Sequence, residues 1–157
     1  MRAFLPILLA QDSGAIVNTS SVFGLVGMPY QSAYCTSKFA VRGFTDSLRQ
    51  ELRGTGVRAA TVHPGGVKTN IARNARYHAP PEAPDMTHEE AAELFDKIAR
   101  MTPERAAEII HKGVKAGKSR ILVGADAHFF DTLARVTPSR YFDVLDFVAR
   151  KLERRSS

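Results

Sequence analysis

The sequence predicts an α/β domain built on a parallel sheet, and two patterns in its 157 residues carry that prediction. Two short apolar runs, Ala15 to Thr19 and Val57 to His63, flank a long stretch in which apolar residues recur at helical spacing. A strand, a crossover helix and a second strand form a βαβ unit, in which the two strands are parallel. Glycines and prolines separate these segments, as they do in compact domains.

Local signals define the elements of the first half. Residues 2–11 resemble the end of a helix, which we expect to be buried, and polar residues and a glycine break it. The strand over 15–19 passes into a glycine-containing loop. Helical spacing then predicts a long helix over 32–53, which glycines end, before the second strand over 57–63.

The second half begins with a loop or lid over 70–86, which has three prolines and few apolar residues. Thr87 and Thr102 each have the character of a helix cap, and Pro103 suits the first position of a helix. The strand over 120–123 comes next. A last amphipathic helix, opened by Thr137-Pro138, is predicted to place these residues along one face: Tyr141, Leu145, Val148 and Leu152.

Composition limits the class of protein. The length and the 44% of hydrophobic residues fit one globular domain over residues 1–157, and no run approaches the ~20 apolar residues that span a bilayer. The net charge of +6 is spread among acidic residues, so we expect no nucleic-acid partner. Cys35 is the only cysteine, which fits a reducing, cytoplasmic environment. The histidines lack metal-ligand spacing, so we expect no metal site.

Polar residues that can carry chemistry gather around the first strand and the helix after it. Ser20 and Ser21 end the strand, while Tyr34 and Lys38 lie in the first turns of the helix. Residues four apart share a helix face, and an ammonium about 4 Å from a phenolate stabilises it by roughly 4 kcal/mol at an effective dielectric of 20. Tyr34 is then a candidate proton donor, and Ser21 a candidate hydrogen-bond partner for a carbonyl or alcohol oxygen.

The same residues have a plain structural explanation. A tyrosine and a lysine four apart occur on many helices as a partly buried ring and a solvated amine, and Pro64-Gly65-Gly66 can be an ordinary turn after a strand. Taken alone, neither pattern indicates an enzyme.

Three ordered segments nevertheless resemble successive motifs of the short-chain dehydrogenases/reductases (SDR). They are residues 16–21 (IVNTSS), 32–38 (SAYCTSK) and 62–69 (VHPGGVKT). That family places its catalytic serine 13 residues before the tyrosine, and this interval selects Ser21 over Ser20 as the partner of Tyr34. The resemblance covers nearly the whole chain, but only about the second half of the family fold.

The resemblance implies part of a Rossmann-type doubly wound parallel sheet, three strands with flanking helices. It also implies NAD(P)-dependent hydride transfer on a small carbonyl/alcohol substrate, with NAD or NADP as the cofactor. In this family the counterpart of Tyr34 exchanges the proton, that of Lys38 stabilises the phenolate and binds the nicotinamide ribose, and that of Ser21 positions the substrate oxygen. The segment near the nicotinamide carboxamide and the pyrophosphate corresponds to Pro64, Gly65, Val67 and Thr69.

Several family features are missing from the sequence. It has no Gly-rich turn after an opening strand, where the family binds the dinucleotide phosphates, and no upstream helix Asn of the catalytic tetrad. We therefore expect an open edge on the first strand and interpret the chain as a truncated or misassigned reading frame. The alternative is a non-catalytic interaction module that self-associates or binds a longer homologue. The substrate, the choice between NAD and NADP, and the oligomeric state are not readable, although family members are commonly homo-oligomers.

Overall fold

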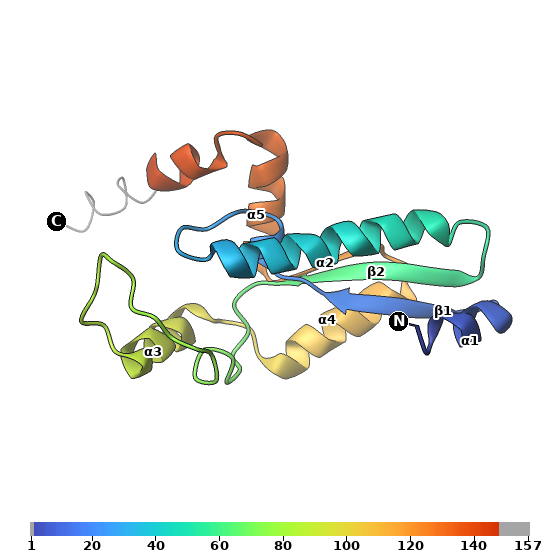
Figure 1. Ribbon diagram of the computed structural model, residues 1–157, viewed down its shortest axis with the longest axis horizontal. Coiled ribbons are helices and arrows are strands. Elements are labelled where there is room, and N and C mark those ends of the chain that lie inside the picture. The colour runs from blue at the N-terminus through green and yellow to red at the C-terminus, as the bar shows by residue number, and fades with distance from the viewer. Residues whose placement is uncertain (1, 148–157) are drawn as a thin grey trace.

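The computed structural model describes residues 2–147 as a three-stranded parallel sheet with helices on both faces (Figure 1). Its elements are, in chain order, α1 (Leu5–Ala10), β1 (Gly14–Thr19), the 3-10 helix η1 (Val22–Gly24), α2 (Ser32–Glu51), β2 (Val57–Pro64), α3 (His88–Ile98), α4 (Pro103–Lys115), β3 (Arg120–Val123) and α5 (Ala125–Val136). A further helical stretch covers 141–147. The predicted α/β class and its three strands are confirmed.

The strand order is β1-β2-β3, and β2 is parallel to both neighbours. The crossover from β1 to β2 runs through α2, and the crossover from β2 to β3 runs through α3 and α4. Residues of β2 are almost all buried, whereas those of β1 alternate between exposed and half-buried. All three strands end at the same edge of the sheet, and open parallel sheets bind their ligands at this edge.

Two apolar clusters attach the helices to the sheet. On one face, Val57 and Ala59 of β2 pack with Leu48 and Leu52 of α2. Alternate residues of β2 point the other way, so Ala60 and the side chains near it face α4. The buried members of this second cluster are Ala60, Val62, Ala106, Ile121 and Val123. Because α2 and α4 cover opposite faces, β2 is the central strand of the core.

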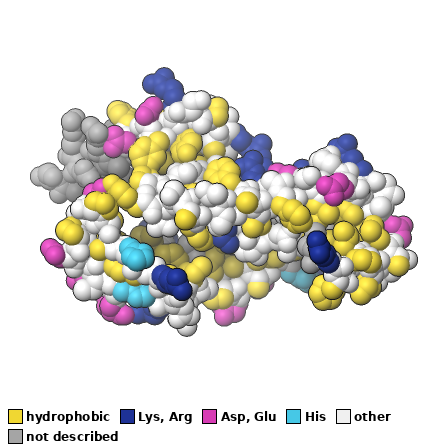
Figure 2. All heavy atoms as spheres, in the orientation of Figure 1, with side chains coloured by type: hydrophobic (Ala, Val, Ile, Leu, Met, Phe, Trp, Pro, Cys, Tyr) yellow, Lys and Arg dark blue, Asp and Glu magenta, His cyan; other side chains and the backbone are white. Residues whose placement is uncertain are grey.

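Helix α1 is exposed, and the expectation of a buried helix is wrong. None of its residues is buried, and Ile7 is 58% exposed, although Leu5 and Leu8 pack beside Ile16 of β1. Figure 2 shows hydrophobic side chains at the surface on the right, where α1 lies in Figure 1. The helix is short and its apolar residues surround its whole circumference, so one sheet edge can cover only part of them.

Helix α5 was not predicted from the sequence. It follows β3 directly from Gly124, which has φ 109° and supplies no capping side chain, so the usual signal of a helix start is absent. Thr137 ends this helix instead of opening the next one, and helical geometry resumes only at Tyr141. Val148 and Leu152, predicted for the last apolar stripe, lie outside the described residues.

The two predicted caps are confirmed. The Thr87 side chain accepts from the N–H of Glu90, and the Glu90 carboxylate accepts in return from the N–H of Thr87, which forms a capping box at α3. Thr102 accepts from the N–H of Arg105 at the start of α4. Residues 70–86 between β2 and α3 contain neither helix nor strand, as expected. No helix within residues 2–147 is long and apolar enough to cross a membrane.

Candidate active site

Ser21 stands at the carboxyl end of β1 and caps η1. Its hydroxyl oxygen accepts a hydrogen bond of 3.1 Å from the N–H of Phe23, which leaves the hydroxyl proton free to donate elsewhere. Its carbonyl accepts from the N–H of Gly24 at 3.0 Å. Ser21 is only 8% exposed, and these two hydrogen bonds hold its hydroxyl oxygen and its carbonyl in place. Ser20 beside it points the other way and donates to the carbonyl of Lys38 at 2.8 Å.

Tyr34 and Lys38 lie one turn apart near the start of α2, on the side that faces the end of β1. The Lys38 ammonium is 5.4 Å from the centroid of the Tyr34 ring and donates to the carbonyl of Thr19 at 3.3 Å. Phe23 meets the same ring edge-on, with centroids 6.1 Å apart and the planes at 88°. The Tyr34 side chain is therefore held between an aromatic ring and an ammonium, while 36% of the residue remains exposed.

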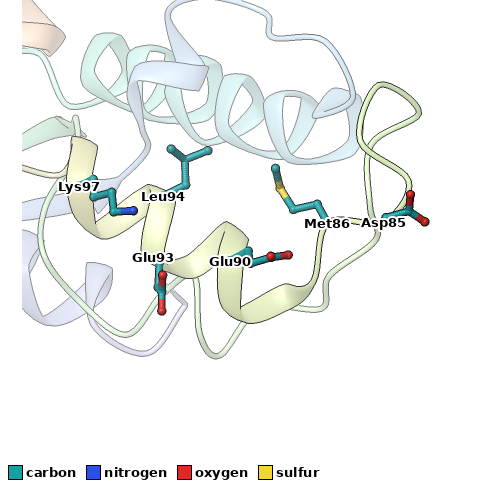
Figure 3. Close-up of a pocket in the computed structure, with 6 residues that line it drawn as sticks. All are labelled: Asp85, Met86, Glu90, Glu93, Leu94 and Lys97. Atoms are coloured by element: carbon teal, nitrogen blue, oxygen red, sulfur yellow. The ribbon is translucent and has the colours of Figure 1, made fainter.

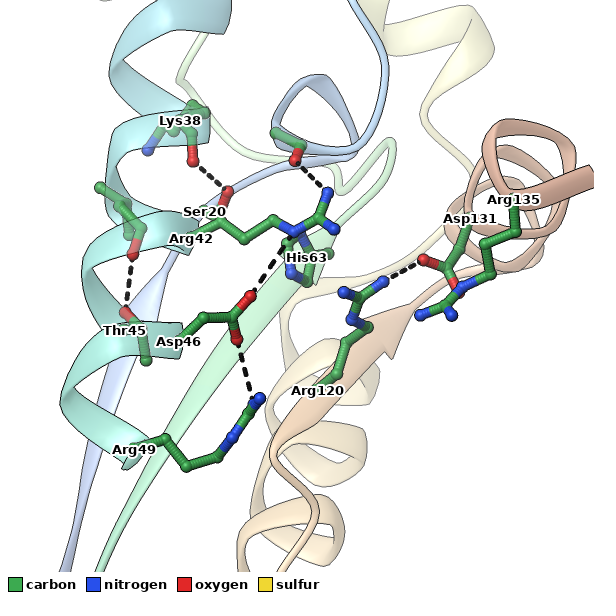
Figure 4. Close-up of polar contacts among 12 residues, drawn as sticks. Ser20, Lys38, Arg42, Thr45, Asp46, Arg49, His63, Arg120, Asp131 and Arg135 are labelled. Atoms are coloured by element: carbon green, nitrogen blue, oxygen red, sulfur yellow. Dashed lines mark hydrogen bonds and ion pairs between the residues drawn. The ribbon is translucent and has the colours of Figure 1, made fainter. Parts of the chain in front are cut away.

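Polar contacts attach α2 to the end of β1 (Figure 4). Asn18 donates to the hydroxyl of Thr45 at 2.9 Å, and Thr45 donates to the carbonyl of Val41. Arg42 donates to the carbonyl of Gly24 at 3.2 Å, one turn after the contact between Ser20 and Lys38. Thr45 is fully buried. These contacts fix the height of α2 over β1, and so they fix where Tyr34 and Lys38 stand relative to Ser21.

The predicted cofactor segment begins where β2 ends. The N–H of Gly65 donates to the carbonyl of Val123 in β3, at 2.9 Å, and the N–H of Gly66 donates to the Asp126 carboxylate at 2.7 Å. A methyl group on Gly65 would lie about 2 Å from that carboxylate, so this position needs glycine unless Asp126 moves. This segment is thus held by the end of β3 and the first turn of α5.

Val67 and Thr69 continue the segment along a short bridge to Met101. The Met101 backbone donates to Gly66 and accepts from Lys68, so the N–H and C=O of Val67 between them point to the other side. Thr69 is exposed, and it lines a hollow of about 370 Å³ with Lys68, Asn70 and Asp96. The N–H and C=O of Val67 are thus turned away from Met101, and the Thr69 hydroxyl, whose oxygen accepts from the N–H of Ile71 at 3.4 Å, keeps its proton free to donate.

Two residues of this region were not recognised from the sequence as parts of a site. Asp126 receives the Gly66 N–H across 60 positions of sequence, and its helix was not predicted. His63 is fully buried at the end of β2, where its Nδ1 lies 3.0 Å from the carbonyl of Ser21. Burial lowers the pKa of His63, and the nearby Arg120 and Arg42 lower it further. Its place one residue before Pro64 was the only available hint.

A hollow of about 510 Å³ opens beside α3, with these residues around it: Asp85, Met86, Glu90, Glu93, Leu94 and Lys97 (Figure 3). The side chains of Met86 and Leu94 project toward the side where α2 passes, whereas Glu93 points away from it. The volume of this hollow is in the range of small-molecule sites. Neither this hollow nor the smaller one is lined by Ser21 or Tyr34, so the two lie at the periphery of the candidate site.

The 70–86 segment is attached at both sides. Arg73 forms ion pairs with Glu89 and, at 2.8 Å, with Asp96 of α3. On the other side, the hydroxyl of Tyr30 donates to Glu82, which joins the loop before α2 to the 70–86 segment. Tyr30 has φ 59°, in the left-handed region that non-glycine residues seldom adopt. The segment is thus tied to α3 and to the loop that leads into Tyr34's helix.

Metal ligation has no candidate group in the described part of the chain. Among residues 2–147, no three His, Cys, Asp or Glu side chains gather where they could hold an ion.

Comparisons with known proteins agree with this architecture. The family model described as short chain dehydrogenase matches residues 1–80, just over half of the chain. SadH of Mycobacterium tuberculosis, which is named as a candidate oxidoreductase, is 47% identical over 129 residues, which are 80% of this chain and 45% of SadH. The chain therefore spans about half the length of this relative.

Solved structures give the same result. A short chain dehydrogenase/reductase from Burkholderia phymatum in complex with NAD superposes with a TM-score of 0.71 at 27% identity, covering 85% of this chain and 51% of that one. A short chain dehydrogenase from Burkholderia cenocepacia in complex with NADP superposes with a TM-score of 0.70 at 24% identity, over 92% and 52% of the two chains, and shows the fold alone. Family model, relatives and fold together place this chain in the short-chain dehydrogenase/reductase family.

Proposed function

We propose that the chain carries the catalytic end of an NAD(P)-dependent oxidoreductase that interconverts a carbonyl and an alcohol. The observation that carries the proposal is the position of Lys38, whose ammonium lies 5.4 Å from the Tyr34 ring centroid and is anchored on the carbonyl of Thr19. Ser21 stands at the same strand end with a hydroxyl proton free to donate. Membership of the family and the NAD complex of the Burkholderia phymatum structure support the assignment.

Tyr34 is the proton donor and acceptor in this proposal. During reduction its phenol gives a proton to the substrate oxygen, and during oxidation its phenolate takes one. Lys38 stabilises that phenolate, because its ammonium lies 5.4 Å from the ring centroid and is held on the carbonyl of Thr19. The packed edge of Phe23 limits the orientations that the Tyr34 ring can adopt.

Ser21 positions the oxygen that reacts. Its hydroxyl donates to the substrate oxygen while the N–H of Phe23 occupies one lone pair, so the direction of the O–H bond is restricted. A donor prepared in this way stabilises the negative charge that develops on the oxygen and holds the oxygen beside Tyr34.

The cofactor segment supplies groups of the right kind for a nicotinamide. The N–H and C=O of Val67, turned away from Met101, match a carboxamide, which both donates and accepts, and Thr69 offers a hydroxyl at the neighbouring hollow. Lys38 would hold the ribose, and the tight passage at Pro64-Gly65 keeps the segment close to the strand ends. NAD or NADP, when bound there, supplies or accepts the hydride.

The 70–86 segment and α3 are the proposed substrate lid. The hollow of about 510 Å³ beside them has Met86 and Leu94 as an apolar wall, which suits a small organic carbonyl or alcohol.

A cytoplasmic location and a homo-oligomeric state are part of the same proposal. The buried lone Cys35 is compatible with the first, and the exposed aromatic residues Phe39 and Phe44 of α2 with the second.

A second candidate function follows from β1 and α1. Within the described residues β1 pairs only with β2, and it lies beside α1, where the N-cap residue Phe4 is 70% exposed. An unpaired strand edge next to exposed apolar side chains is a surface on which another chain can add a strand. The chain would then be an interaction module. Analytical ultracentrifugation with Val17→Lys, on the open face of β1, tests this function: a monomer that the variant does not change speaks against it.

A cofactor titration tests the enzymatic proposal. NADH and NADPH are titrated into the purified chain, and their fluorescence is compared for the wild type, Lys38→Met and the control Lys112→Met in α4. We expect saturable binding that weakens only in Lys38→Met. No saturable change with either cofactor would contradict the proposal that this chain holds the nicotinamide.

A further inference from the structure

We propose that His63, near the carboxyl end of β2, is a positioning residue for Ser21. Its imidazole donates a hydrogen bond to the Ser21 carbonyl at the end of β1. The inference rests on the proposed function, because it concerns how the Ser21 hydroxyl is presented to the substrate oxygen. It adds a residue that itself touches neither substrate nor cofactor.

The hydrogen bond determines the tautomer of His63. Its Nδ1 lies 3.0 Å from the Ser21 carbonyl oxygen, and a carbonyl can only accept, so Nδ1 must carry the hydrogen. The other nitrogen, Nε2, is buried without a hydrogen-bond partner. A proton there would be a buried unsatisfied donor, which costs about 1–3 kcal/mol, more if charged. The arrangement therefore favours a neutral imidazole with its hydrogen on Nδ1.

Two cations near the ring also disfavour a charged imidazole. Arg42 of α2 and Arg120 of β3 repel a proton on His63, whereas Asp131 of α5 attracts one (Figure 4). Arg120 and Asp131 are paired with each other, so the carboxylate is already engaged by a cation. His63 is thus a neutral donor among charged neighbours.

The hydrogen bond from His63 adds to others that already hold Ser21. The Ser21 carbonyl accepts from two donors, the N–H of Gly24 and Nδ1 of His63, while its hydroxyl oxygen accepts from Phe23. The peptide plane after Ser21 is therefore fixed from both the loop side and the strand side. If the imidazole donor is removed, the Ser21 carbonyl keeps only the N–H of Gly24, and the peptide after Ser21 loses its one side-chain contact to β2, although the N–H of Ser20 still donates to the carbonyl of Val62.

The same residue joins two parts of the proposed site. His63 directly precedes Pro64, where the cofactor segment starts, and its ring reaches across to the end of β1. The His63 side chain thus adds a direct link between Ser21 and the start of the proposed nicotinamide segment, next to the backbone hydrogen bond from Ser20 to Val62. Misplacement of a reacting group by about 1 Å can reduce a rate ~100-fold.

The test combines two variants of His63 with a control, in two backgrounds. His63→Phe keeps a ring but has no donor, whereas His63→Asn places an amide nitrogen at about the position of Nδ1. Thr61→Val is the control, since Thr61 lies on the same face of β2, is 1% exposed and has an unpartnered hydroxyl oxygen. Each is made in the wild type and in Ser21→Ala, with carbonyl reduction as the assay.

We expect His63→Phe to lower kcat by ~10–100-fold with little change in the KM for NADH or NADPH. His63→Asn should recover most of the loss, and Thr61→Val should leave kcat unchanged. In Ser21→Ala the change to Phe should have no further effect, because the hydroxyl that it misdirects is gone. Equal losses in both backgrounds, or no recovery with Asn, would overturn the proposal.

A readout without turnover separates this inference from the proposed function. In protein labelled with ¹⁵N-histidine, the His63 shifts at neutral pH should report the Nδ1–H tautomer, and the Ser21 carbonyl ¹³C shift should move in His63→Phe but hardly in His63→Asn. An Nε2–H tautomer or a charged ring would overturn the inference even in an active protein. The expected tautomer in a chain without turnover would count against the proposed function alone.

Discussion

Gly65 has room for no side chain, and replacing it tests how the cofactor segment is held. A Cβ at this position would lie 2.0 to 2.2 Å from the Asp126 carboxylate, far inside contact distance. The Asp126 carboxylate can move away by rotation of its side chain. If it does, it loses its hydrogen bond of 2.7 Å from the N–H of Gly66.

The expected cost follows from that lost bond. A hydrogen bond to a charged group contributes about 1.5–3 kcal/mol, and the exposure of Asp126 favours the lower half of the range. We therefore expect Gly65→Ala to reduce the free energy of unfolding by about 2 kcal/mol and the Tm by roughly 4–8 °C. Thermal unfolding followed by circular dichroism measures both.

A double-mutant cycle tests the cause. In Asp126→Ala the carboxylate is absent, so adding Gly65→Ala should change the stability by less than about 0.5 kcal/mol. Gly43→Ala is the matched control, because a Cβ there meets nothing within 4 Å on the exposed side of α2. That control should stabilise the chain by about 0.4–1 kcal/mol. Additive costs of Gly65→Ala and Asp126→Ala would show that the Asp126 carboxylate is not the cause of the loss.

Three further predictions concern charge and capping. Lys38→Met should lower kcat by ~10-fold or more. A unit charge 5.4 Å from the Tyr34 ring stabilises the phenolate by about 3 kcal/mol at an effective dielectric of 20, and exposure to solvent halves that energy. An unchanged kcat would contradict the role of Lys38. Acid should destabilise the fold in two windows, measured by urea unfolding at several pH values. The pKa of His63 is lowered from 6.5, mainly by burial, so the unfolded chain binds more protons and stability falls as the pH drops below about 6.5. For Asp131, burial raises the pKa, but bonds and attraction to Arg135 and Arg120 outweigh it and hold it below 3.8, so its contribution is lost only as the pH falls below that value. His63→Asn should abolish the upper window and spare the lower one. Thr87→Ala should cost about 1 kcal/mol and lower the Tm by ~2–4 °C, because it removes the capping box of α3, and an unchanged Tm would show that the box contributes nothing.

The sheet could be predicted from the sequence because its signals are local. Apolar runs mark β1, β2 and β3, and the helical spacing between the first two runs requires a parallel crossover. The caps Thr87 and Thr102 were readable for the same reason, since both the capping residue and its target lie within one turn. The placement of Tyr34 and Lys38 on one face of α2 followed from helix geometry alone.

The remaining features depend on contacts that a local pattern does not contain. Helix α5 begins at a glycine with positive φ instead of at a capping side chain, so its start gave no signal. The exposure of α1 depends on what packs against it. Asp126 acquires its contact with Gly66 only when β3 lies beside β2, and His63 reaches Ser21 only across two paired strands. Such residues become visible when the sheet is assembled.

Hydride transfer by the wild type and by Tyr34→Phe is the most direct test of Tyr34 as the proton donor of an oxidoreductase. The protein is mixed with NADH or NADPH and a panel of small aldehydes and ketones, and the loss of nicotinamide absorbance is followed alongside cofactor binding. We predict carbonyl-dependent oxidation of at least one cofactor by the wild type, and binding without oxidation by Tyr34→Phe. Equal oxidation by both proteins would contradict the role of Tyr34. If the wild type neither binds nor oxidises either cofactor, the proposal that this chain is an oxidoreductase is contradicted.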